Sequence, residues 1–309
     1  MPSKFRKKFA SLVCAIIPHK NTRSMVRDFI EMPDVKNRIC RMMRGAKMWR
    51  AERKLLQSGY KFPHALAIVA IMKNEGPYLR EWIEFHKLVG VEKFYLYNND
   101  SSDDTSEILK PYIESGLVDL IDFPGDKRQV PAYNDCIERH KMDTRWLAVI
   151  DLDEFIVPDA CGNTIGDMLQ NIKDNVSQIF IRWVMYGSSG HDKKPDGLVA
   201  ENFIMRGAKL TWHYKAIVNP RLVHEMDCHR HSVAKKTIEQ PVKQIRINHY
   251  HCKSWEEYSK RAARGTAYKG QKVGAVRYTR EFFDARDTND VTDRIMDKYL
   301  SQLKKNLRK

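Results

Sequence analysis

The sequence predicts an α/β fold with a doubly wound, mostly parallel sheet and added helices at both ends of the chain. Apolar runs at 66–72, 93–97, 117–123 and 146–151 fit buried strands, and segments with helical spacing separate them. Polar loops follow these runs, and the loops after parallel strands meet at one edge of such a sheet. We therefore expect a ligand site at that edge.

The central part of the chain justifies this fold element by element. A boundary at Ser58 and Gly59 precedes the first strand, and Pro77 stands in the first turn of a helix, where proline is tolerated. Ser254 and Glu257 have the spacing of a capping box, which opens a later helix. In chain order we expect strand 66–72, helix 77–89, strand 93–97, helix 105–115, strand 117–123, helix 132–140, strand 146–151, helix 164–172, strand 177–185, a long loop at 187–197, helix 254–265 and helix 289–307. The long loop suits an acceptor-binding segment or a lid.

The two ends of the chain are basic, whereas the middle is neutral. Of the formal net charge of +15, residues 1–60 carry +11, and residues 301–309 add four Lys or Arg and no acids. We therefore expect a basic amphipathic helical region at 1–60, a central domain at 61–288 and a basic C-terminal helix at 289–309. A neutral middle argues against a nucleic-acid-binding groove, so no nucleic acid is expected as a partner.

The first basic region has the pattern of a surface helix. Residues 4–27 place apolar side chains on one face at helical spacing, with cations before and after them, and residues 35–55 continue as a second basic helix. Such a helix suits docking on an anionic membrane surface, although a helix packed on its own domain gives the same pattern. No apolar stretch reaches the roughly 20 residues that are needed to cross a bilayer.

The clearest functional signal is the pair Asp151 and Asp153, which ends an apolar strand. Side chains alternate along a strand, so both carboxylates should leave the sheet edge on the same side. Two such close carboxylates repel each other unless a cation lies between them, which indicates a metal site for a diphosphate. Solvated acids in a turn would give the same pattern. The loops after the other strands would bring Glu75, Asp100 and Arg128 to the same pocket.

Several motifs occur in an order that resembles the nucleotide-sugar-dependent glycosyltransferases of the GT-A fold. The resemblance covers residues 65–270 and is closest to glycosyltransferase family 92 and its bacterial family 2-like relatives. The matching segments are residues 69–75, 81–86, 98–104, 132–136, 151–155, 186–191, 215–220 and 249–254, together with Gln129, Lys260, Arg264 and Gly265.

The resemblance implies transfer of a hexose, with inversion, from a nucleoside diphosphate sugar, a UDP-sugar, to a glycan or lipid-linked acceptor. Asp153 would bind Mn²⁺ or Mg²⁺, and Asp151 would contact the ribose or reach the metal through water. Asp100 would hold the uracil edge, and Glu75 would line the same nucleotide pocket. A divalent ion would stabilise the charge that develops on the leaving diphosphate.

Two roles stay open among the remaining candidates. His229 or His231 could supply a further metal ligand, and the sequence does not choose between them. An inverting enzyme needs a general base near the acceptor hydroxyl, for which His191, Asp192 and Glu201 are candidates.

The basic start that runs into Pro18 lies outside this match but resembles the starts of bacterial surface-polysaccharide transferases. It leads us to expect a bacterial protein that is cytoplasmic, lies at the inner face of the membrane and acts in surface polysaccharide or lipopolysaccharide synthesis. The alternatives are a non-catalytic membrane or nucleic-acid-binding adaptor and a zinc-stabilised nucleotide-binding protein. The six cysteines form no Cys-x-x-Cys pair and are read as reduced thiols. A zinc site would draw on Cys228, His229, His231, His249, His251 and Cys252, although strand alternation could instead place each His-x-His pair on one face of the acceptor site.

Overall fold

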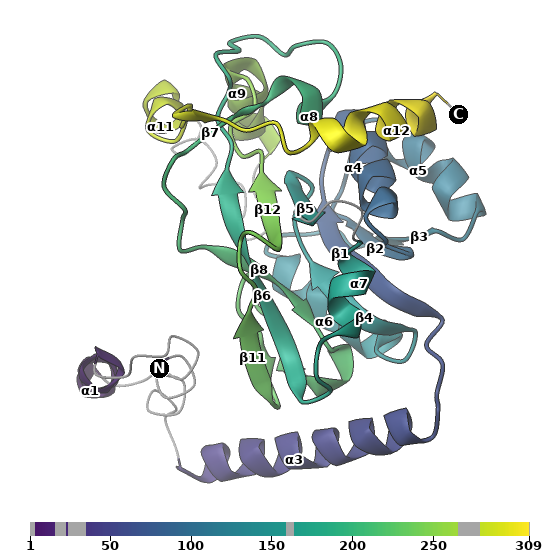
Figure 1. Cartoon of the computed structure of the whole chain (residues 1–309), viewed down its shortest axis with the longest axis vertical. Coiled ribbons are helices and arrows are strands. Elements are labelled where there is room, and N and C mark those ends of the chain that lie inside the picture. The colour runs from purple at the N-terminus through teal and green to yellow at the C-terminus, as the bar shows by residue number, and fades with distance from the viewer. Residues whose placement is uncertain (1–3, 16–22, 24–34, 159–163, 265–278, 309) are drawn as a thin grey trace.

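The computed structural model describes residues 4–15, 23, 35–158, 164–264 and 279–308 (Figure 1). Its main sheet has nine strands in the order β3-β2-β1-β4-β8-β6-β12-β5, with β11 paired to β6. The strands are β1 (His64–Met72), β2 (Lys93–Asn98), β3 (Val118–Asp122), β4 (Thr144–Val149), β5 (Glu154–Pro158), β6 (Val176–Met185), β8 (Tyr214–Val218), β11 (Lys236–Glu239) and β12 (Ile245–His249).

Helices and two small sheets surround this sheet. The small sheets pair β9 (Val223–Glu225) with β10 (Ser232–Val233) and β7 (Met205–Arg206) with β13 (Val291–Thr292). The helices are α1 (Lys4–Ala15), α3 (Val35–Gln57), α4 (Gly76–Leu88), α5 (Thr105–Glu114), α6 (Gln129–His140), α7 (Ile165–Gln170), α8 (Val199–Asn202), the 3₁₀ helix η1 (Pro220–Leu222), α9 (Trp255–Arg264), α11 (Arg280–Asp284) and α12 (Asp297–Leu307). No helix in the described part of the chain is long and apolar enough to span a membrane.

The first four strands of the sheet order are parallel, and both of their faces are covered. Alternate residues of β1 enter two separate hydrophobic clusters, Leu66 and Ile68 in one and Ala67 and Val69 in the other. The first cluster includes residues of α4 and α12, which pack on each other, and the second includes residues of α6. The predicted α/β class with a mostly parallel, doubly wound sheet and added helices at both ends is confirmed.

The antiparallel part of the sheet was not expected from the sequence. β8 lies antiparallel between β4 and β6, and β12 runs parallel to β6 and antiparallel to β5. These strands carry buried polar residues, namely Lys215 in β8 and Arg246 and Asn248 in β12. Such residues break the apolar pattern of a buried strand, and only partners from distant segments make their burial favourable.

The C-terminal helix begins later than predicted. The expected helix 289–307 is α12 only from Asp297, because the preceding residues form β13 and a buried ion-pair network. Asp293 accepts hydrogen bonds from Arg206 at 2.6 Å and from Arg246 at 2.9 Å. Burial alone would raise the pKa of Asp293, but these two guanidinium groups lower it to about 2. The C-terminal segment is therefore tied to the sheet by charge as well as by apolar packing.

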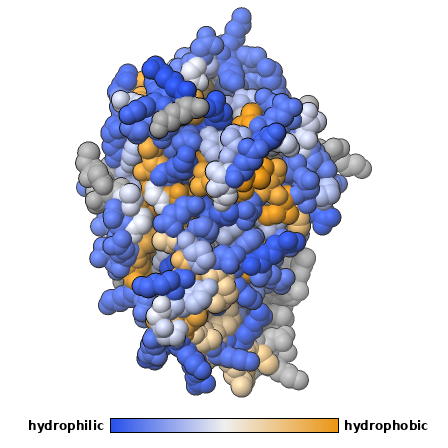
Figure 2. Space-filling view, turned by 90° about the vertical axis from the view of Figure 1, so that its right-hand side faces the viewer, coloured by the Kyte–Doolittle hydropathy of each residue, from blue (hydrophilic) through white to orange (hydrophobic). Residues whose placement is uncertain are grey.

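Hydrophobic and hydrophilic residues are interspersed on the outer surface of the side that carries α5 and β3. Figure 2 shows hydrophobic residues there in separate areas that hydrophilic side chains divide. Such scattered apolar residues are normal for the surface of a folded domain.

A buried carboxylate is central to the attachment of helix α3 to the rest of the protein. Glu52 accepts hydrogen bonds from Asn219 at 2.8 Å, Arg145 at 3.0 Å and Arg221 at 2.6 Å. The region predicted to end at residue 60 is thus attached by this helix to η1 and β4, whereas its docking on a membrane surface stays a prediction.

We expect Glu52→Ala to lower the free energy of unfolding by about 3 kcal/mol, because the substitution leaves Arg145 and Arg221 without their shared anion. Urea unfolding followed by circular dichroism measures the change. Glu114→Ala, at an exposed position of α5, is the matched control and should change the free energy by less than about 0.5 kcal/mol. Equal effects of the two substitutions would contradict the attachment of α3 through Glu52.

Candidate active site

The predicted acid pair lies in the turn that joins β4 to β5. Asp151 and Asp153 follow the last residue of β4 by two and four positions, and Glu154 opens β5. The carboxyl groups of these three residues each offer a ligand oxygen, and these oxygens lie within 4.8 Å of one another. Trp82 fixes the turn from α4 by donating its indole N–H to the Glu154 carbonyl oxygen at 2.8 Å.

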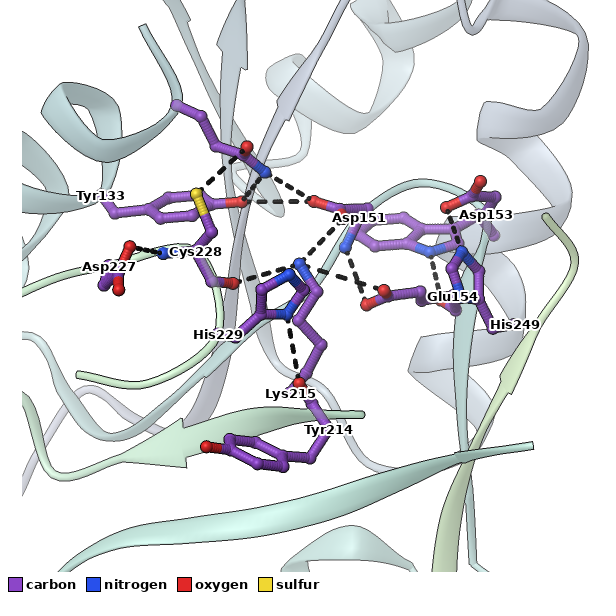
Figure 3. Close-up of polar contacts among 12 residues, drawn as sticks. Tyr133, Asp151, Asp153, Glu154, Tyr214, Lys215, Asp227, Cys228, His229 and His249 are labelled. Carbon is purple, nitrogen blue, oxygen red and sulfur yellow. Dashed lines mark hydrogen bonds and ion pairs between the residues drawn. The ribbon is translucent and has the colours of Figure 1, made fainter. Parts of the chain in front are cut away.

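Asp151 has hydrogen-bond partners on both of its carboxylate oxygens (Figure 3). Oδ2 accepts from Lys215 Nζ at 2.8 Å, and Oδ1 accepts from Gln129 Nε2 at 3.0 Å and from the Tyr133 hydroxyl at 3.3 Å. Gln129 and Tyr133 lie on α6, whereas Lys215 lies on β8. Asp151 is therefore held in one orientation by a helix that covers the parallel strands and by a strand of the antiparallel part of the sheet.

Lys215 is a fully enclosed cation between two acids. Its side chain is 1% exposed, and Nζ lies 2.8 Å from Asp151 and 3.9 Å from Glu154. Burial alone would lower the pKa of Lys215, but these two carboxyl groups raise it above its ordinary value. The lysine thus remains charged, as a compensating group for the acids requires.

Glu154 is the most buried of the three acids in the turn. Its carboxyl oxygen Oε2 accepts from the Asp151 backbone N–H at 3.1 Å, and Oε1 is buried without a hydrogen bond. Burial, followed by the charges of Asp151 and Asp153, raises the pKa of Glu154 well above its ordinary value. Its carboxyl group therefore supports the turn and does not face solvent.

Asp153 has looser contacts than Asp151. Oδ1 lies 3.5 Å from His249 Nε2, and Oδ2 lies 3.5 Å from an Arg261 guanidinium nitrogen. Burial alone would raise the pKa of Asp153, but His249, Arg261 and Lys253 hold it well below its ordinary value. The carboxylate is therefore charged, and its contacts are longer than the 2.7–2.9 Å that is typical of charge-assisted hydrogen bonds.

Two histidines of β12 and the segment after it complete a group that could hold a metal ion. Asp153, His249 and His251 each offer a ligand atom, and these atoms lie within 4.8 Å of one another. His249 Nδ1 is buried without a hydrogen bond. A carboxylate with two imidazoles is a donor set that transition metals such as Mn²⁺ accept. Of the two metals that the sequence implies, the residues present thus fit Mn²⁺ better than Mg²⁺, which prefers oxygen ligands.

His229 and His231 lie elsewhere in the same half of the protein. The His229 imidazole lies 3.3 Å from the Tyr214 carbonyl oxygen, and His231 Nδ1 accepts from the Asp227 backbone N–H at 3.1 Å. Neither belongs to a group of ligand atoms that could hold a metal among the described residues. The structure places His249 and His251, rather than the histidines expected from the sequence, beside Asp153.

The loops after β1, β2 and β3 are tied together beside this turn. The Asn74 side-chain oxygen accepts from the Ser102 backbone N–H at 2.7 Å, and Asp100 accepts from the Gly125 backbone N–H at 3.1 Å. Asn74 and Asp100 have φ angles of 52° and 57°, a conformation that asparagine and aspartate tolerate well. The loops expected to form the nucleotide pocket therefore do converge at one edge.

Glu75 and Arg128 take different positions in this edge. Glu75 is the N-terminal cap residue of α4 and is buried. The charges of Glu75 and Asp153 both favour the charged form of Lys253. Burial and the charge of Arg261 lower the pKa of Lys253 to about 8. Arg128 is exposed, and its guanidinium Nε donates to the Pro124 carbonyl oxygen at 2.6 Å.

Of the predicted base candidates, His191 and Asp192 lie in the segment that leads to α8, and Glu201 lies in α8 itself. Asp192 is exposed and pairs with Arg280 at 3.0 Å, and Glu201 pairs with Lys304 at 2.6 Å. The His191 imidazole packs against the Phe203 ring, with 5.7 Å between ring centroids. The described contacts join none of the three directly to Asp151 or Asp153.

Lys215, Lys253 and Arg261 were not assigned a role from the sequence. A single lysine in the apolar run of β8 is the signal that could have marked Lys215, because a lysine enclosed in a strand requires an anion. Lys253 and Arg261 stand among many other cations in the sequence, and no local pattern separates them from surface residues.

We expect Lys215→Met to lower the free energy of unfolding by about 3–5 kcal/mol, since it leaves Asp151 and Glu154 without their cation. Lys260→Met is the control, because Lys260 is 71% exposed and pairs with Glu256 on the surface, which is worth less than about 1 kcal/mol. Urea unfolding of Asp151→Asn, Lys215→Met and the double mutant gives the coupling between the two side chains. A strictly additive double mutant would show that the pair does not act as a unit.

Comparisons with known proteins agree on one family. The model of glycosyltransferase family 92 matches residues 69–307. A glycosyltransferase family 92 protein of Oryza sativa subsp. japonica is 28% identical over 204 residues, which is 63% of this chain and 34% of that protein. A beta-1,4-galactosyltransferase of Caenorhabditis elegans is 24% identical over 253 residues, or 76% of this chain and 56% of that protein. A galactan beta-1,4-galactosyltransferase of Arabidopsis thaliana is 28% identical over 193 residues, or 56% of this chain and 38% of that protein.

These matches correct one expectation and limit another. The relatives are plant and nematode proteins, so the expectation of a bacterial protein at the cytoplasmic face of its membrane is wrong. The basic N-terminal region suggested that origin, but the match to the family model begins only after it. The chain spans about a third to just over half of the length of these relatives, whose activities belong to longer proteins.

Proposed function

Because the chain belongs to glycosyltransferase family 92, we propose that the site around Asp151 and Asp153 transfers a hexose from a nucleoside diphosphate sugar to a glycan. The observation that carries this proposal is the group formed by Asp153, His249 and His251 beside the charge-compensated Asp151. This group offers a binding site for a divalent cation at the sheet edge where the loops proposed to bind the nucleotide converge. The adaptor alternative assigns no role to such a group.

The proposed donor is a UDP-sugar, and the proposed sugar is galactose. The named relatives include a beta-1,4-galactosyltransferase and a galactan beta-1,4-galactosyltransferase, which supports a galactosyl donor and a galactose-containing acceptor. Asp100 and Glu75 remain the proposed contacts of the nucleotide, and Arg128 lies at the exposed rim of the same loops. The predicted role in surface polysaccharide or lipopolysaccharide synthesis stays a prediction.

The metal would be held by Asp153, His249 and His251. When bound, Mn²⁺ or Mg²⁺ supplies a Lewis acid for the charge that develops on the leaving diphosphate. Arg261 and Lys253 lie beside Asp153 and bring further positive charge to the same place. Asp151 is fixed by Lys215, Gln129 and the Tyr133 hydroxyl, and it would contact the ribose or reach the metal through water.

Inversion requires a base that accepts the proton of the acceptor hydroxyl as the glycosidic bond forms. Asp192 and Glu201 are each engaged in an ion pair, with Arg280 and Lys304 respectively. The His191 imidazole has only a ring contact among the described residues, and we propose it for this role. The proton would pass from the acceptor oxygen to the imidazole, and the diphosphate would leave from the opposite face of the sugar.

The zinc-stabilised alternative is not favoured by the arrangement of the cysteines. Cys228 lies 3.5 Å from Gln129, and Cys252 is enclosed in a cluster with Tyr258 and Phe283. Neither of the two groups of possible metal ligands among the described residues contains a cysteine. A site without thiolates and with a carboxylate suits an exchangeable catalytic cation better than a structural zinc ion.

We expect Asp153→Asn and His249→Gln to weaken binding of Mn²⁺ by more than about 100-fold, because each removes a proposed ligand. Isothermal titration calorimetry with Mn²⁺ in the presence of UDP measures this, and hydrolysis of UDP-galactose with Mn²⁺ gives a second readout. His229→Gln is the matched control and should keep both properties, while melting temperatures verify that all three variants fold. Loss of Mn²⁺ binding in His229→Gln but not in His249→Gln would show that His229, as expected from the sequence, is the metal ligand and that His249 is not.

We expect Asp100→Ala to raise KM for UDP-galactose by about tenfold with little change in kcat. A contact to the base is made equally in the ground state and the transition state, so its loss weakens binding without slowing the chemistry. Steady-state hydrolysis over a range of donor concentrations measures both constants. Asp126→Ala, at an exposed position in the adjacent loop, serves as the control. An unchanged donor KM in Asp100→Ala would place the nucleotide elsewhere.

A further inference from the structure

A tryptophan lies exposed beside the candidate active site. The Trp212 side chain is 71% exposed, although tryptophan is usually largely buried, and Leu210 next to it is 55% exposed. Both stand in the segment between β7 and β8, on the side of the sheet away from β2 and β3 (Figure 1). A single exposed apolar residue carries little meaning, so the surroundings of Trp212 decide its interpretation.

Trp212 is the outer end of a row of aromatic rings that leads to the proposed metal ligand. Its ring stacks on His213 with centroids 4.0 Å apart, and His213 stacks on Trp183 at 5.2 Å. Trp183 in turn contacts the His249 ring at 4.2 Å. Trp183 and His249 are buried, so the exposed ring of Trp212 is the aromatic surface that this row presents to solvent. The ring contacts join it to the group that includes Asp153.

Hydrogen bonds hold the backbone segment that carries the two outer rings. Arg182 donates to the Trp212 carbonyl oxygen at 2.7 Å, and the Trp183 backbone N–H donates to the His213 carbonyl oxygen at 3.1 Å. Burial, and next the charge of His249, lower the pKa of His213, so its ring is neutral at neutral pH. An exposed ring that is fixed in this way gives up little conformational freedom when a ligand covers it.

The row approaches Asp153 from the side opposite to the nucleotide loops. In the sheet order, β8 and β6 lie on one side of β4, whereas β1 and β2, whose loops carry Glu75 and Asp100, lie on the other. A donor nucleotide over β1 and β2 leaves the aromatic surface uncovered. The remaining substrate of a transfer reaction is the acceptor.

We propose that Trp212, stacked on His213, forms an acceptor subsite that binds a pyranose ring of a β-linked glycan on its exposed face. The inference rests on the proposed function and names the residues that recognise the acceptor chain. One face of a β-galactosyl or β-glucosyl ring presents C–H groups, and the flat apolar face of an indole is the complementary surface. A chain whose terminal hydroxyl lies near Asp153 would cover Trp212 with one of its preceding sugar units.

Calorimetric binding of β-1,4-linked galactotetraose tests the subsite without requiring transfer. We expect Trp212→Ala to weaken this binding by about fivefold to tenfold, and Trp212→Phe, which keeps an aromatic face, to retain most of it. Met43→Ala, at a 68% exposed position of α3, is the matched control and should bind as the unsubstituted protein does. In transfer assays the same loss should appear in the acceptor KM, with the donor KM unchanged.

Two results would overturn the subsite. One is equal binding of galactotetraose by Trp212→Ala and Met43→Ala, or no binding by the unsubstituted protein. The other is a rise in the KM for UDP-galactose hydrolysis in Trp212→Ala, which would assign the ring to the nucleotide. Metal-dependent hydrolysis of UDP-galactose, measured in parallel, reports on the proposed function alone, so a failure of the subsite and a failure of the enzyme assignment are distinguishable.

Discussion

The ion pair between Lys215 and Asp151 is the constraint on which the arrangement of the active-site turn depends. Asp151, Asp153 and Glu154 bring three carboxyl groups within a few ångströms, and such groups repel one another unless cations compensate them. Lys215 supplies one of these charges from inside the protein, at 2.8 Å from Asp151. The pair is weak evidence for high stability, because burying both charges costs free energy, but the removal of either partner leaves an uncompensated charge.

The antiparallel insertion in the sheet explains how this lysine reaches the turn. β8 pairs with β4 so that Ala216 lies opposite Val149, the last residue of β4. Lys215 is therefore placed next to the residues that immediately follow β4, where Asp151 lies. On the far side of the same sheet, β12 pairs with β5 so that His249 lies opposite Glu154. The register of two strand pairs thus brings both the compensating cation and the proposed metal ligand to one turn.

The sequence predicted the parallel half of the fold and its acids, but not the partners of those acids. Strands such as β1 are apolar on both faces and end in polar loops, so their position and the convergence of Asn74 and Asp100 follow from local pattern. The roles of His249 and Lys215 depend on pairings between segments more than 60 residues apart, which local pattern does not encode. His229-Arg-His231 and His249-Tyr-His251 look alike in the sequence, and only the register of β12 distinguishes them. The basic N-terminal region misled in another way, because charge composition reports on electrostatic partners and not on the origin of a protein.

Asp151 and Asp153 differ in how tightly their carboxylate oxygens are held, and this difference suits them to different roles. Asp151 has a hydrogen bond on each oxygen from a fixed neighbour, whereas the contacts of Asp153 are 3.5 Å long and leave its oxygens able to bind a cation. The cations near Asp153 would repel a metal ion that arrived alone. A metal bound together with a diphosphate brings nearly balanced charge, and Lys253, whose pKa burial lowers to about 8, would gain an anion that favours its charged form. Since the anion offsets the repulsion that the metal meets, the charges of this site favour the binding of metal and donor as a pair over the binding of either one first.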